Sequence, residues 1–148
     1  MKIAILAAAI AIAAPAFAPA FAQSDAIQTR QAMMKKVGGN TKAGGDMLKG
    51  AAPFEAAKAE AIFKVMNDVA KDYANHFPAG SETGGDTTAS PAIWAKPAEF
   101  KAAVAKFEKD SGAAMAAKPQ TLAAFGQQFG MVTANCKSCH EAFRISKK

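Results

Sequence analysis

The stretch TLAAFGQQFGMVTANCKSCHEAFR, residues 121–144, decides the fold. Seven of its residues are spaced alternately three and four apart: Leu122, Phe125, Phe129, Val132, Cys136, Cys139 and Phe143. This spacing places their side chains on one face of an α-helix, as in the seam of a helical bundle. We therefore predict a helix over residues 120–146 whose buried face carries both cysteines of the chain.

Three further segments show helical periodicity, and no segment alternates between polar and apolar residues as a half-buried strand would. Four amphipathic helices with mostly short connections predict an all-α fold, an antiparallel four-helix bundle, with a generic all-α domain as the alternative. The expected bounds are residues 24–49 for the first helix, capped by Ser24 or Asp25; residues 53–76 for the second, starting at Pro53; and Pro97 to the turn at 117–121 for the third.

Two features inside this pattern carry further expectations. Four glycines in the first helix each weaken it by roughly 1 kcal/mol relative to alanine, so we expect a close approach of a bulky group or a bend there. Residues 78–91 form a long loop that either wraps something or is mobile. The four glycines are Gly38, Gly39, Gly44 and Gly45.

The second helix has an expected buried stripe. Its residues are Phe54, Ala57, Ala61, Val65, Val69 and Tyr73, with Ile62 and Met66 beside it.

The N-terminus has the pattern of a secretory signal. Lys2 precedes an apolar run over residues 3–14, and the small-residue pattern Ala20-Phe21-Ala22 follows. We expect cleavage after Ala22, with Ala18 as the second choice. The mature protein, residues 23–148, would then be one four-helix-bundle domain without a membrane span, exported to the periplasm in a bacterium.

The charge pattern limits the function classes. The formal net charge is +6, and the lysines are scattered among acidic residues and alanines. No basic run is interleaved with aromatic residues, so we expect no nucleic-acid partner. A solvated surface explains the charge, and so does docking to an acidic redox partner. The sequence contains no nucleophile with an orienting base and no paired carboxylates at helical spacing, so we do not predict an enzyme.

The segment Cys136-Lys137-Ser138-Cys139-His140 matches C-x-x-C-H, the attachment signal for c-type haem. Two thiols three residues apart lie on one side of a helix and can form two thioethers, and the histidine that follows can ligate the iron. A dithiol redox site, a zinc site and a plain disulfide are the competing interpretations. They fit less well, because the motif lies deep in a helix with no preceding strand and few other metal ligands are present.

The motif and its order along the chain resemble those of class II c-type cytochromes, the cytochrome c′ family. The C-x-x-C-H signal lies near the C-terminus and is followed by EAFR, and DAIQTRQAMM resembles the first helix of the family. MLKGAAPFE resembles the connection to its second helix, and FPAGSET and SPAIW resemble the loop before its third helix. The resemblance covers essentially the whole mature chain.

The resemblance implies roles for individual residues. Cys136 and Cys139 would hold one covalent haem c, and His140 would be the proximal iron ligand. Arg144 falls where the family has a basic residue near the proximal face. Arg30 would lie near a haem propionate, where a guanidinium suits a carboxylate geometrically.

Met34 is the residue on which the function depends, since in this family its position faces the open side of the iron. A methionine ligand gives a low-spin, six-coordinate electron carrier, because methionine sulfur favours reduced iron. Without ligation the iron is five-coordinate and binds small gases, and Met34 is a flexible core residue. Met33 is the alternative in register, and His76 would allow a bis-histidine haem, although we expect it at the surface.

The sequence therefore predicts a periplasmic mono-haem electron carrier that exchanges electrons with periplasmic redox proteins. The first alternative is a high-spin cytochrome c′ that binds or buffers nitric oxide or carbon monoxide. The second is a haem-free thiol redox protein. Many relatives dimerise through their first two helices, so the resemblance also allows a homodimer, and the small residues Ala43, Gly44 and Gly45 would permit such packing.

Overall fold

The computed structural model describes residues 20–146. The signal expected over residues 1–22 therefore lies almost wholly outside the described residues. The helices are α1 (Ala20–Leu48), α2 (Ala56–Tyr73), the 3-10 turn η1 (Ala74–His76), the short α3 (Ala92–Ala95), α4 (Pro97–Ala117) and α5 (Leu122–Phe143).

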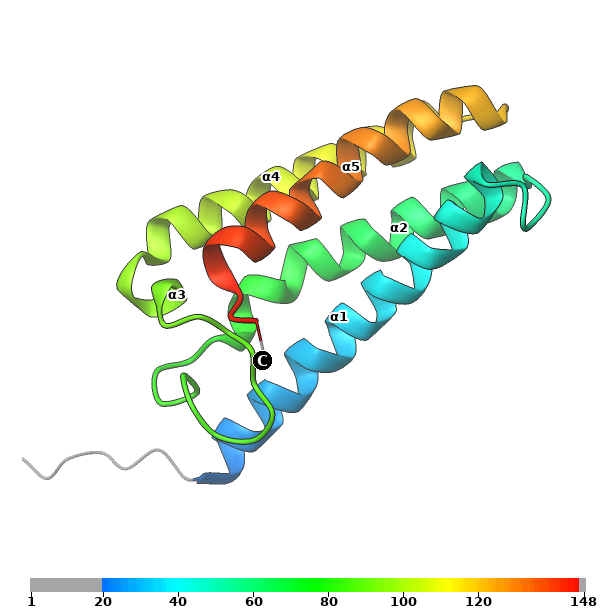
Figure 1. The fold of residues 1–148 in the computed structure, drawn as a ribbon. Helices are drawn as coiled ribbons and strands as arrows, with labels where there is room; N and C mark the ends of the chain where they lie inside the picture. The colour runs from blue at the N-terminus through cyan, green and yellow to red at the C-terminus, as the bar shows by residue number, and fades with distance from the viewer. Residues whose placement is uncertain (1–19, 147–148) are drawn as a thin grey trace, which may run out of the picture.

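The four long helices form an antiparallel bundle, which confirms the predicted fold class (Figure 1). The chain runs up α1 and down α2, crosses through a long loop and α3, and then runs up α4 and down α5. Helix α2 packs against α4 and α1, and α5 packs against α4 and, less extensively, α1. Among residues 20–146, no helix combines the length and apolar character needed to cross a bilayer.

The first two helices do not begin where the sequence predicted. Helix α1 already begins at Ala20, so Ser24 and Asp25 lie inside it rather than capping it. Helix α2 begins at Ala56, and Pro53 belongs to the preceding turn. That turn depends on Gly50, whose φ of +72° is accessible to glycine without a steric penalty. The amides of residues 49–52 bond back to the last carbonyls of α1, which ends the helix.

The predicted buried stripe of α2 was correct only in part. Val69 is buried, and so are Ile62 and Met66, which were expected beside the stripe. Ala57 and Ala61 are exposed, and the buried Phe63 was missed. Alanine gains little from burial, so a stripe of alanines loses to a neighbouring face with larger apolar side chains. The α5 seam was predicted correctly apart from Leu122, which is exposed at the first position of its helix.

The hydrophobic core is divided into two clusters along the bundle. The first lies at the end that holds the two hairpin turns and centres on Phe63, Met66 and Phe125, with ring centroids of Phe63 and Phe125 5.4 Å apart. The second lies at the end with the long loop and contains Ile93, Phe100, Val104 and Phe143, with Cys139 packed against it. Cys139 therefore lies at the loop end of the bundle.

One of the four α1 glycines marks a close approach between α1 and α5. A Cβ atom built on Gly44 would clash with the ring of Phe129, whereas a Cβ on Gly38, Gly39 or Gly45 meets nothing within 4 Å. The expected approach of a bulky group is thus confirmed at Gly44. The absence of a side chain there lets the Phe129 ring lie against the α1 backbone.

We expect Gly44→Ala to lower the free energy of unfolding by about 1–3 kcal/mol, because the added methyl overpacks the core against an aromatic ring. Gly45→Ala is the matched control in the next position of the same helix. It should raise stability by up to about 1 kcal/mol through helix propensity. Urea unfolding of the two variants measures the difference, and adding Phe129→Leu to Gly44→Ala should recover part of the loss. Equal effects at the two glycines would contradict the close approach.

Candidate cofactor-binding site

A cavity of about 570 Å³ lies at the loop end of the bundle, a volume within the usual range for ligand sites. Its walls come from α1, the end of α2, the long loop, α4 and the C-terminal part of α5. The residues that line it include Arg30, Met34 and Val37 from α1; Tyr73 and Phe77; Thr87, Thr88 and Ala89 of the loop; Phe100, Val104 and Phe107 from α4; and Asn135, Cys136, Cys139, His140 and Arg144 from the last helix.

Cys136 and Cys139 present their thiols to this cavity from one side of α5. Both are free and half-buried. Burial raises the pKa of the Cys136 thiol and, together with the neighbouring Cys136, that of the Cys139 thiol. Reactive dithiols have lowered pKa values that favour the thiolate. The raised values therefore do not favour the dithiol redox interpretation.

His140 lines the same cavity immediately after the second cysteine. Burial lowers the pKa of its imidazole, and the Arg144 charge lowers it further. A neutral imidazole with a free ring nitrogen is the form that binds a metal ion. Arg144 itself lies at the end of α5, exposed, and also lines the cavity.

Met34 lines the cavity from α1, so the fold brings it to the same space as His140. Met33 is half-buried but is not among the lining residues, because it lies about 100° further around the helix. The structure therefore favours Met34 over Met33 as the residue that faces a cofactor. Its role as an iron ligand remains a proposal.

Arg30 is buried, with 3% of its surface exposed, and its guanidinium ties the long loop to α1. Nη1 donates to Ser81 Oγ at 2.9 Å, and Nη2 donates to the Ser81 carbonyl and to Thr87 Oγ1, each at 2.8 Å. The guanidinium also lies 4.8 Å from the ring centroid of Phe77. Burial lowers the pKa of Arg30. Its propionate role remains a proposal, and the bonds to the loop are a contribution that the sequence did not predict.

Part of the loop lies against the cavity, in agreement with the expectation that it wraps something. We call residues 87–90 the strap. At one end Thr87 accepts the bond from Arg30 on α1. At the other end the Ser90 amide donates to the Phe143 carbonyl at 3.0 Å, and the Ile145 amide donates to the Thr88 carbonyl at 2.9 Å. The strap thus connects α1 to the C-terminal end of α5 across the cavity.

His76 does not contribute a ring nitrogen to the cavity. Its Nε2 lies 2.8 Å from Asp72 Oδ2 on the outside of α2, and its carbonyl accepts from Arg30. The imidazole is not among the cavity-lining groups. This position agrees with the surface role expected from the sequence.

Asn135 is a site residue that the sequence analysis missed. It is buried beside Cys136 and lines the cavity, and its Nδ2 donates to Asp110 Oδ2 on α4 at 2.8 Å. Lys106 Nζ donates to its Oδ1 at 3.2 Å and also pairs with Asp110. The bond from Asn135, followed by that from Lys106, lowers the pKa of Asp110. The available signal was a polar residue in an apolar seam, one position before the motif.

Aromatic rings cover the inner end of the cavity. Phe77 lies 4.7 Å from Phe100 between ring centroids, Phe100 lies 5.4 Å from Phe143, and Tyr73 lies 5.1 Å from Phe77. Burial raises the pKa of Tyr73 to about 12, so its hydroxyl stays neutral. Such a wall suits a large, flat, apolar group.

Comparisons with known proteins agree on one family. The family model described as cytochrome C′ matches residues 25–144. Cytochrome c-556 of Agrobacterium fabrum is 36% identical over 121 residues, which cover 82% of each chain. The solved structure of cytochrome c′ from Rhodopseudomonas palustris is 39% identical, with a TM-score of 0.80, and the match covers 84% of this chain and 98% of that chain. A further cytochrome c′, described by its ligand-controlled dimer dissociation, is 25% identical with a TM-score of 0.77 over 84% of this chain and 97% of that one.

Proposed function

The chain belongs to the cytochrome c′ family of c-type haem proteins, and on that premise we propose that it is a single-haem electron carrier rather than an enzyme. Covalently attached haem c is the cofactor of the family. When bound, the haem iron supplies one-electron transfer. The residues of this chain determine how the haem is held, which ligands the iron has and how exposed the haem is.

The residues that line the cavity fit a covalently held haem. Cys136 and Cys139 provide two thiols toward one apolar space, and His140 follows them with a neutral imidazole. Phe77 and Phe100 provide an apolar, aromatic surface. On this proposal the two thiols hold the haem, His140 is the proximal ligand, and the cationic groups Arg30 and Arg144 lie near its polar periphery.

The observation that carries the electron-carrier proposal is that Met34 lines the same cavity as His140. A thioether is a soft, neutral ligand that stabilises reduced iron, so a Met/His pair suits reversible electron transfer. A methionine at this position also fills the space that an incoming gas molecule would need.

The competing candidate is a high-spin gas-binding protein. In that case Met34 would pack against the haem face without ligation, as flexible methionines do in cores. Nitric oxide or carbon monoxide would then bind at the open position.

The ferric optical spectrum of the purified holoprotein decides between these candidates. We expect a low-spin spectrum with the charge-transfer band of a methionine–iron bond. A high-spin spectrum that lacks this band would overturn the ligation by Met34 and support the gas-binding candidate. A pyridine haemochrome assay on the same sample tests the haem-free thiol alternative, because it reports covalent haem directly.

Location and assembly complete the proposal. The signal at residues 1–22 would direct the protein to the periplasm, where residues 23–148 form the mature cytochrome and its redox partners are exported proteins. One relative is described as a dimer whose dissociation is controlled by a ligand, and we propose that this chain also forms a homodimer. N-terminal sequencing of the exported protein tests the cleavage site, and sedimentation tests the assembly.

A further inference from the structure

The cavity opens to solvent between two helices. Most of its lining residues are buried or half-buried, and the exposed ones come from α1 and from the end of α5. On α1 these are Gln31, Lys35 and Gly38, and on α5 they are His140 and Arg144. A cofactor held in this cavity would therefore be most accessible to a second protein through the gap between α1 and the end of α5.

A second hollow of about 590 Å³ adjoins this opening on the outside of α5. It shares Thr88, His140 and Arg144 with the cavity, and Lys137, Glu141 and Ser146 complete it. The side chain of Lys137 is 82% exposed, and its nitrogen lies 3.8 Å from Glu141. Among the described residues that line the opening and the hollow, Lys35, Lys137 and Arg144 are exposed permanent cations, and Glu141, which pairs with Lys137, is the one carboxylate.

We infer that these three residues, which we call the basic rim, form the docking surface for an acidic electron-transfer protein. The inference rests on the proposed electron-carrier function and specifies its partner by charge. Cations around the exposed side of a redox site attract a partner that carries carboxylates, raise the encounter rate and orient the partner toward the cofactor. In each encounter one electron passes between the haem iron and the redox group of the partner, so one is oxidised and the other reduced.

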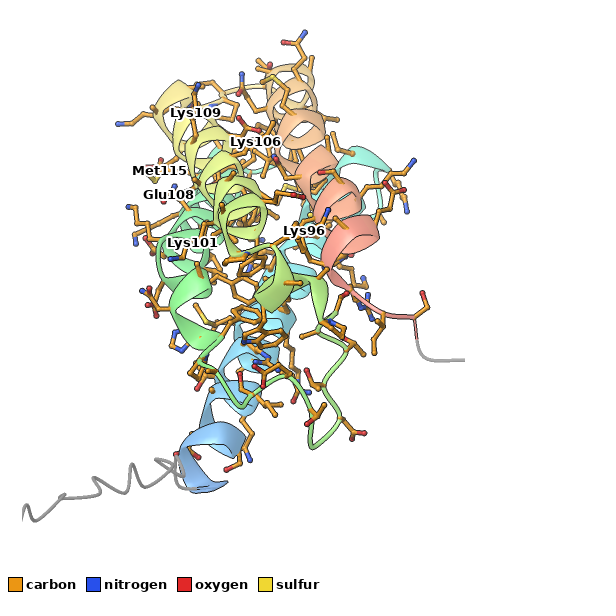
Figure 2. The ribbon with its side chains drawn as sticks, turned by 90° about the vertical axis from the view of Figure 1, so that its left-hand side faces the viewer. Lys96, Lys101, Lys106, Glu108, Lys109 and Met115 are labelled. Carbon is orange, nitrogen blue, oxygen red and sulfur yellow. The ribbon has the colours of Figure 1, made fainter. Side chains whose placement is uncertain are left out.

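The lysines of α4 do not provide an equivalent surface. Lys101, Lys106 and Lys109 lie on α4, and Lys96 lies directly before it (Figure 2). None of these four lysines lines the cavity or the hollow. Lys96 pairs with Glu99, and Lys106 pairs with Asp110, so positively and negatively charged side chains alternate along this face. A partner on this face would meet the outer side of a helix rather than the opening of the cofactor cavity.

Small inorganic oxidants measure the charge at the electron-transfer site. The reduced holoprotein gives one electron to ferricyanide, an anion that becomes ferrocyanide, or to tris(phenanthroline)cobalt(III), a cation that becomes cobalt(II). At about 10 mM ionic strength the Debye length is about 30 Å, so surface charges act over a long distance. Under these conditions we expect ferricyanide to react faster than the cobalt complex. The rate with ferricyanide should fall with added salt, whereas the rate with the cobalt complex should rise.

The variant that tests the rim is Lys35→Glu with Lys137→Glu, compared with Lys101→Glu and Lys109→Glu on α4. Both pairs change the net charge by the same amount. We expect the rim pair to slow ferricyanide about tenfold at low salt and to speed the cobalt complex, and the α4 pair to do much less. Equal effects of the two pairs would mean that overall charge decides, and the inference would be overturned. Lys35→Glu alone leaves the attachment motif intact and gives the same test if Lys137→Glu impairs haem attachment.

Two further measurements identify the kind of partner. Poly-L-glutamate should slow the reaction of the wild type with ferricyanide by occupying the rim, and should have little effect on the rim variant. If instead the protein co-sediments with phosphatidylglycerol vesicles through the same lysines, the rim is a membrane-binding surface and the inference fails. The ferric spectrum reports separately on ligation by Met34. A negative result for docking at the basic rim can therefore be distinguished from a negative result for the electron-carrier proposal.

Discussion

Met34→Ala should convert the ferric protein from a low-spin to a high-spin spectrum and abolish the methionine–iron charge-transfer band. Met34 lines the cavity that also contains His140, and no other thioether lines it among the described residues. Removal of the sulfur leaves the iron with one protein ligand and leaves space on the α1 side of the cavity. The variant should therefore also bind carbon monoxide or nitric oxide far more readily than the wild type.

Met33→Ala is the control for this prediction, because it removes the same side chain from the neighbouring position of the helix. It should leave the spectrum low-spin. Met34→Leu keeps the volume but not the sulfur, and should be high-spin with weaker gas binding than Met34→Ala. An unchanged spectrum in Met34→Ala would exclude Met34 as a ligand, and loss of the band in Met33→Ala would move the ligand by one residue.

Cys136→Ala combined with Cys139→Ala should abolish covalent haem and with it the stable fold. The cavity of about 570 Å³ is largely apolar. Because the cavity opens to solvent, its apolar walls would be wetted without the haem and would lose the burial that stabilises this end of the bundle. We therefore expect the apoprotein to keep helical content but to lose cooperative thermal unfolding.

Ser138→Ala is the matched control for the cysteine variants, because it lies in the same motif. Its hydroxyl is exposed and bonds only to carbonyls of its own helix, at Ala134 and Asn135. This variant should keep covalent haem and unfold near the wild-type temperature. The pyridine haemochrome assay and circular dichroism melting are the measurements. A cysteine-free protein that melts as cooperatively as the wild type would show that the bundle does not depend on the haem.

The motif-bearing helix was predictable because several strong signals coincide in it. Phe125, Phe129, Val132 and Phe143 repeat at bundle spacing, and large aromatic side chains gain most from burial. The second helix was harder, because its alanines repeat at the same spacing on more than one face. Only the larger residues Ile62, Phe63 and Met66 determine which face is buried.

The contacts that assemble the site join residues far apart in the sequence, and the local sequence pattern does not predict them. Arg30 and Met34 are four residues apart, so their common face was expected. The partners of Arg30 in the loop, Ser81 and Thr87, are 51 and 57 residues away and depend on how the loop crosses the bundle. The bond between Asn135 and Asp110 likewise depends on the register of α5 against α4. Sequence spacing carries no information about such pairs.

The strap, residues 87–90, has a consequence for the width of the site. Its four residues can span no more than about 14 Å even when fully extended. One end is attached through Arg30 to the helix that carries Met34, and the other end is attached to the last turn of the helix that carries His140. The two helices cannot move apart at this end without breaking those bonds, so a short piece of backbone acts as a fixed-length tether that limits the separation of the two candidate ligands.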